Sequence, residues 1–138
     1  MSTHLKEKEE KILDTLEKIG DESIKGIPII VEGKKDKQAL RQASIMGRII
    51  EAKTGGKSIL EVINEINSCN VDKVILLLDF DRRGKEWTKR LVQHLETMQI
   101  KPNITFWNRL RKIIGHEVKD IEGLSRYLET LRNRICNS

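Results

Sequence analysis

The most constraining feature of the sequence is a run of apolar residues that is followed at once by acids. Residues 73–78 read Lys-Val-Ile-Leu-Leu-Leu, without the polar alternation of a half-exposed strand. Such a run is typical of a strand that is covered on both faces in a parallel sheet. It is also far shorter than the roughly 20 apolar residues that a membrane-spanning helix requires. The sequence therefore predicts a central parallel strand and no membrane span.

Strand and helix patterns alternate around this central strand. Short β-branched or aromatic runs predict three further strands, at residues 27–31, 48–52 and 104–107. Apolar residues at helical spacing predict the helices between them, at residues 36–47, 58–66 and 85–98. This alternation implies βαβ units with right-handed crossovers. We therefore expect an α/β fold, with a doubly wound, mainly parallel four-stranded sheet and helices on both faces.

Two amphipathic helices are predicted outside the sheet. One covers about residues 4–19 and is expected to end at Gly20-Asp21, and the other covers about residues 120–136. The chain has 138 residues, of which 38% are hydrophobic, enough to build one core. We expect residues 1–138 to form a single domain, with its core at about 27–107.

Acidic residues follow two of the predicted strands directly. Glu32 comes after the first strand, and Asp79 and Asp81 come after the most buried one. In an open parallel sheet the site lies beyond the carboxyl ends of the strands, so these carboxylates converge if the two strands are neighbours. Phe80 points away from them, because side chains alternate along a strand. Gathered carboxylates favour a hard divalent cation, and magnesium is the expected one.

These acids also have a structural interpretation. Acids at strand ends commonly solvate a turn or cap the next helix, and both Asp36 and Asp81 are placed to do so. Each acid taken singly is therefore a weak signal. The combination of an acid-Gly pair after one strand with Asp-x-Asp-x-x-Gly after a wholly apolar strand is a stronger one.

These two segments resemble the signature motifs of the toprim domain. The first segment is residues 29–36, Ile-Ile-Val-Glu-Gly-Lys-Lys-Asp, and the second is residues 77–86, Leu-Leu-Asp-Phe-Asp-Arg-Arg-Gly-Lys-Glu. Toprim domains occur in topoisomerases, bacterial-type primases, recombination proteins of the RecR kind and several nucleases, including a ribosomal-RNA maturase. The resemblance covers roughly residues 27–107, and the whole chain looks like a small free-standing prokaryotic toprim protein.

The resemblance implies a role for each matching residue. Glu32 would act as the general acid or base and would also bind the metal. Asp79 and Asp81 would bind Mg²⁺, with Mn²⁺ as a substitute, while Gly33 and Gly84 would allow close approach of the backbone. Such a set suits phosphoryl or nucleotidyl transfer, in which the metal polarises a phosphate and a carboxylate handles the proton.

Basic residues are concentrated directly after the predicted metal ligands Asp79 and Asp81. Residues 82–112 contain nine Lys and Arg and two acids, a net charge of +7, whereas the whole chain carries +5. A solvated helix face would explain this excess, but phosphates approaching the metal would also meet it. The expected phosphate contacts lie within the two motif segments: Lys34, Lys35, Arg82, Arg83 and Lys85.

Two other features have simpler explanations. Residues 54–58, Thr-Gly-Gly-Lys-Ser, end like a P-loop, but the first glycine of that motif would fall at position 51, which is Glu51. The segment is therefore expected to be a loop, followed by a helix that Ser58 caps. Trp87 and Trp107 are expected to be core residues rather than platforms for stacked bases.

Missing features narrow the functions that the resemblance allows. The only tyrosine, Tyr127, lies in the predicted C-terminal helix, so a topoisomerase nucleophile is not expected. Cys69 and Cys136 are isolated, which argues against the zinc sites of bacterial-type primases and RecR-like proteins. A small Mg²⁺-dependent nuclease or nucleotidyl-transfer protein remains. The alternative is a non-catalytic, nucleic-acid-binding or scaffold subunit of a larger DNA- or RNA-processing complex.

We expect the protein to act in the cytoplasm on DNA or RNA. The first residues alternate charges and lack the apolar segment of a secretory signal. The sequence favours neither polymer over the other and leaves the oligomeric state open.

Overall fold

The computed structural model describes residues 2–137 and contains a four-stranded, all-parallel sheet. The strand order is β2-β1-β3-β4. From the central β1 the chain first winds to β2, and then crosses back to β3 and β4 on the other side. The direction of winding thus reverses between β1 and β3. The strands span Ile29–Val31 (β1), Ile49–Glu51 (β2), Lys73–Leu76 (β3) and Lys101–Asn103 (β4).

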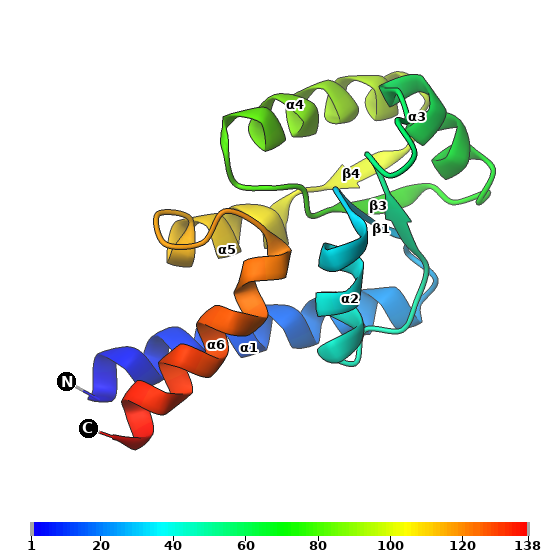
Figure 1. Ribbon diagram of the computed structural model, residues 1–138. Helices are drawn as coiled ribbons and strands as arrows, with labels where there is room; N and C mark the ends of the chain where they lie inside the picture. The colour runs from blue at the N-terminus through cyan, green and yellow to red at the C-terminus, as the bar shows by residue number, and fades with distance from the viewer. Residues whose placement is uncertain (1, 138) are drawn as a thin grey trace.

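Helices cover both faces of the sheet, which confirms the predicted α/β fold (Figure 1). One face carries α3 (Ile59–Asn67) and α4 (Arg82–Thr97). The opposite face carries the remaining four helices, which span Ser2–Ile24 (α1), Lys34–Gln42 (α2), Thr105–Ile114 (α5) and Ile121–Cys136 (α6). Among residues 2–137, no helix combines the length and apolar character that crossing a membrane demands.

Successive side chains of the central strands point to opposite faces of the sheet and so belong to two separate cores. Ile30 and Leu76 pair in register and face the layer of α3 and α4. Ile29 and Ile75 also pair in register, and they face the other layer. All four side chains are at most 1% exposed. The central strands are thus covered on both faces, which is why their sequences are apolar without a break.

The strand predicted at residues 104–107 is wrong. The edge strand lies earlier, at Lys101–Asn103, and Thr105 begins helix α5. The Asn103 side-chain oxygen accepts a hydrogen bond from the Thr105 backbone N–H at 2.8 Å, which helps start the helix. The helix buries Phe106 and Trp107 in the core, as expected for the tryptophan. Packing of this apolar face outweighs the β propensity of the segment.

The predicted end of the N-terminal helix is also wrong, since α1 continues through Gly20 and Asp21 to Ile24. Ser23, near its end, is only 3% exposed and packs where a side chain on Gly47 would otherwise sit. This tertiary contact favours continuation of the helix despite the cost of an internal glycine. The predicted cap of α3 is confirmed, because the Ser58 hydroxyl accepts from the Glu61 N–H at 3.2 Å.

Candidate metal centre

Asp79 lies just beyond the end of β3, and contacts on both sides hold its backbone. The indole N–H of Trp107 donates to the Leu78 carbonyl oxygen at 2.8 Å, in a buried hydrogen bond. The Phe80 N–H donates to the Lys119 carbonyl oxygen at 2.6 Å. This bond holds the segment that leads into α6 against the loop of residues 79–81, which follows β3. Such contacts fix where the Asp79 carboxylate can point.

Gly84 completes the support of this loop. A Cβ atom at Gly84 would overlap the carbonyl group of Asp79, so only glycine lets the first turn of α4 pack this closely. Gly33 differs, because its extended backbone, with φ of −140°, suits any residue, and a Cβ there would lie 3.8 Å from the nearest atom, an Asp36 oxygen. At Gly84, the backbone that approaches closely is therefore that of Asp79 in the same chain.

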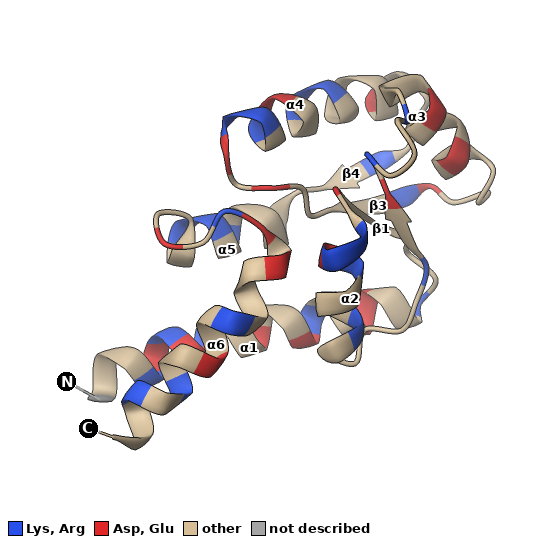
Figure 2. Cartoon of the chain, viewed as in Figure 1, with Lys and Arg blue, Asp and Glu red and all other residues tan. Residues whose placement is uncertain are grey.

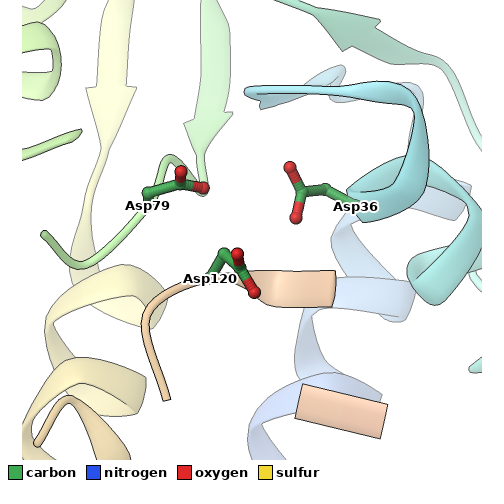
Figure 3. A group of neighbouring side chains, drawn as sticks. All are labelled: Asp36, Asp79 and Asp120. Carbon is green, nitrogen blue, oxygen red and sulfur yellow. The ribbon is translucent and has the colours of Figure 1, made fainter. Parts of the chain in front are cut away.

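Three aspartates from separate parts of the chain meet at this edge of the sheet (Figure 3). Asp36 comes from the first turn of α2, Asp79 follows β3, and Asp120 immediately precedes α6. One carboxylate oxygen from each lies within 4.8 Å of the other two. Carboxylate oxygens are the donors that a hard divalent cation prefers.

Two of these aspartates also hold helix ends together. The Asp36 carboxylate accepts from the Gly33 N–H at 3.0 Å and from the Glu122 N–H at 2.8 Å, so it joins the first turns of α2 and α6. Asp120 accepts from the Gly123 N–H at 2.7 Å and caps α6. These bonds orient the carboxylates and leave them lone pairs for a further ligand.

Glu32 follows β1 and lies beside Asp79. It is 9% exposed, and its Oε1 atom accepts no hydrogen bond from the residues that the structure describes. The Lys53 ammonium lies 3.4 Å from that atom. Burial of Asp79, together with hydrogen bonding and repulsion from Glu32, raises the pKa of Asp79 to about 9. A bound cation would relieve this repulsion, so the donor set fits a divalent metal.

Asp81 has a different setting from the other acids. It is exposed, and its Oδ1 atom accepts from the Gly84 N–H at 2.8 Å as the N-cap of α4. The three-carboxylate group contains Asp79 but neither Asp81 nor Glu32. The structure thus brings together two acids named from the sequence, Glu32 and Asp79, and adds Asp36 and Asp120 beside them.

Basic residues lie beside the acidic edge, in the first turns of α2 and α4 (Figure 2). All five lysines and arginines expected to contact phosphate are exposed. Two of them lie near acids: Lys35 is 3.9 Å from Glu122, and Arg82 is 3.4 Å from Glu86. The other three are Lys34, Arg83 and Lys85. The amino-terminal ends of α2, α4 and α6 also begin at this edge and add partial positive charge.

Sequence reasoning missed Asp36, Asp120 and Lys53 as members of this site, and Asp36 was named only as a possible helix cap. Asp120 lies 41 positions after Asp79, and two long-range contacts bring it close, from the Phe80 N–H to the Lys119 carbonyl oxygen and from the Glu122 N–H to the Asp36 carboxylate. The one available signal is its place at the start of the helix predicted at about residues 120–136. The sequence pattern predicts only a loop at Lys53, directly after the strand predicted at residues 48–52, although Lys53 follows the strand that pairs with the strand before Glu32.

Comparisons with known proteins agree with this fold. The toprim domain model matches residues 27–110. A UPF0292 protein of Methanosarcina acetivorans is 34% identical over 125 residues, covering 91% of this chain and 85% of the relative. A UPF0292 protein of Methanocaldococcus jannaschii is 35% identical over 120 residues, covering 86% and 91%.

A solved structure of an Aquifex aeolicus protein also matches, with a TM-score of 0.66 and 28% identity, over 79% of this chain and 94% of that one. Asp120 lies outside the residues that the domain model matches, so α6 adds to the site from beyond the common core. The chain belongs to the toprim domain family and to the UPF0292 proteins.

Proposed function

We propose that this protein is a Mg²⁺-dependent phosphodiesterase that cleaves nucleic acid. The observation that carries the proposal is the convergence of Glu32, Asp36, Asp79 and Asp120 on one sheet edge that is flanked by exposed lysines and arginines. The toprim match supports a metal-dependent function related to nucleic acid. A negatively charged polymer is the substrate class that such flanking cations attract.

Asp79 is the central ligand in this proposal, because it interacts with Glu32, Asp36 and Asp120 alike. Asp36 and Asp120 supply further oxygens, and their helix contacts hold them in place. When bound, a magnesium ion polarises the phosphate and stabilises charge on its oxygens. Asp81 remains a candidate ligand, as its exposed carboxylate follows the same strand.

Glu32 is the proposed proton-transfer group. It is largely buried beside Asp79, and one of its oxygens has no hydrogen-bond donor among the described residues. A positioned carboxylate can take the proton of an attacking water or return one to the leaving oxygen. Arg83 and Lys85, in the first turn of α4, would hold the phosphates on either side of the scissile bond.

The test is cleavage of single- and double-stranded DNA and RNA with Mg²⁺ present. Glu32→Gln is expected to keep nucleic-acid affinity and to lose about 10²–10⁴-fold in rate, as when a general acid or base is removed. The matched control is Glu61→Gln, because Glu61 is exposed in the first turn of α3 and belongs neither to the three-aspartate group nor to the Lys53–Glu32 pair. Equal rates for wild type and Glu32→Gln would contradict the proposed role of Glu32.

A non-catalytic role is the second candidate, and one observation favours it. Asp36, Asp81 and Asp120 all accept backbone N–H groups at helix starts, so each has a structural use without any metal. A protein that binds nucleic acid with salt-dependent affinity but cleaves none of the four polymers would be assigned to this role. It would then act as a binding or scaffold subunit of a processing complex.

A further inference from the structure

Lys53 contacts the acidic edge and an aromatic ring at the same time. It follows β2, and its backbone N–H donates to the Glu32 carbonyl oxygen at 2.9 Å, which places the two residues side by side. Its ammonium lies 3.4 Å from Glu32 Oε1 and 5.0 Å from the centre of the Trp87 ring on α4. One cation thus joins the buried carboxylate to the helix that carries the exposed basic residues.

Glu32 needs a counter-charge when no metal is present. Its side chain is 11% exposed, and within residues 2–137 no group donates a hydrogen bond to its Oε1 atom. A buried carboxylate without compensation is costly, and Lys53 supplies the compensation through charge. The same oxygen is therefore available to a divalent cation, provided that the ammonium gives way.

We propose that Lys53 is the counter-cation that a metal must displace from Glu32, and that the Trp87 ring holds the displaced ammonium. This inference deepens the proposed function and rests on it. The face of an indole attracts an ammonium group within about 6 Å, so Lys53 has a second favourable contact already in place. Lys53 is thus a positioning residue that competes with the metal and lowers its affinity.

Lys57 provides a matched control in the same loop. Its ammonium lies 2.8 Å from a Glu65 oxygen and donates to the Glu51 carbonyl oxygen at 3.0 Å. Both lysines are partly exposed, at 26% for Lys57 and 27% for Lys53. Removing the charge of Lys57 changes the loop charge equally without touching Glu32.

The experiment is calorimetric titration of Mg²⁺ into the wild type and into the Lys53→Met, Lys53→Arg and Lys57→Met variants. We expect Lys53→Met to bind Mg²⁺ about three- to tenfold more tightly, as fits the loss of a partly buried competing ion pair. Lys53→Arg and Lys57→Met should stay near the wild-type Kd. If circular dichroism shows that Lys53→Met is misfolded, Lys53→Gln is used in its place, because it removes the same charge.

Tryptophan fluorescence gives a second readout that is independent of activity. Displacing the ammonium changes the surroundings of Trp87, so Mg²⁺ should shift the emission of the wild type, and Trp87→Phe should lose that shift. The shift should also be absent in Lys53→Met, where no ammonium moves. A Mg²⁺-dependent shift of the same size in the wild type and in both variants would come from Trp107 alone and would contradict movement of Lys53 at the Trp87 ring.

The outcomes separate this inference from the proposed function. If the wild type binds Mg²⁺ and Lys53→Met binds it equally or more weakly, Lys53 does not compete with the metal. The proposed metal centre would be unaffected by that result. Failure of both proteins to bind Mg²⁺ would overturn the metal centre and this inference with it. Binding by Lys53→Met alone would support the competition.

Discussion

Replacement of Asp79 by asparagine is expected to stabilise the metal-free protein at neutral and alkaline pH. Burial and the neighbouring Glu32 raise the pKa of Asp79 from its usual value of 3.8 to about 9. The carboxyl is therefore protonated in the folded protein over a pH range where the unfolded chain is ionised. Because the folded pKa is the higher one, the folded state loses stability as the pH rises from about 4 to about 9. Asparagine cannot ionise and avoids this loss.

The size of the effect follows from the shift in pKa. Each pH unit above the usual pKa of Asp79 lowers the free energy of unfolding by about 1.4 kcal/mol. Without solvent screening, the loss at pH 8 would be about 5–6 kcal/mol. Asp79 is only partly buried, and solvent screening reduces such a cost several-fold. We expect Asp79→Asn to raise the free energy of unfolding by about 1–2 kcal/mol at pH 8 and to change it little at pH 4.

The assay is urea unfolding between pH 4 and pH 9 with EDTA present, followed by far-ultraviolet circular dichroism. Asp81→Asn is the control, because asparagine is as good an N-cap as aspartate and should leave stability nearly unchanged. With Mg²⁺ at 100 times its Kd, the wild type should gain about 2.7 kcal/mol and Asp79→Asn should not. A variant less stable than the wild type at pH 8 in EDTA would refute the reasoning.

Three further predictions concern the support of the site and its charge. Gly84→Ala should lower the free energy of unfolding by about 2–4 kcal/mol in urea, because the new methyl group would overlap the Asp79 carbonyl. Trp107→Phe should cost about 1–3 kcal/mol in the same assay, since the buried Leu78 carbonyl loses its hydrogen-bond donor. Arg83→Ala should reduce the salt dependence of nucleic-acid affinity by about one unit of log Kd per log salt, measured by fluorescence anisotropy, and an unchanged slope would exclude a phosphate contact there.

The sequence was sufficient to predict the central part of the fold because its signals are local. The unbroken apolar run before Asp79 predicted the buried strand, and alternation of strands and helices predicted the parallel sheet. The topology then places the ends of β1 and β3 side by side, so Glu32 and Asp79 could be expected to meet.

The remaining features depend on contacts between distant segments. The aromatic and β-branched character of residues 104–107 suggested a strand, but burying Phe106 and Trp107 against the other helices favours a helix. Likewise, nothing near Asp120 in the sequence indicates that the Lys119 carbonyl binds the Phe80 N–H. A carboxylate brought to a site by such long-range contacts cannot be identified from local periodicity.

The most direct test of the metal centre is anomalous diffraction from crystals grown with Mn²⁺ at millimolar concentration. We expect a peak about 2.0–2.3 Å from an Asp79 oxygen, with ligands drawn from Glu32, Asp36, Asp81 and Asp120. Crystals of Asp79→Asn grown in the same way should show none. A wild-type crystal without a peak at Asp79, in which these acids only cap their helices, would contradict a metal centre at this edge of the sheet.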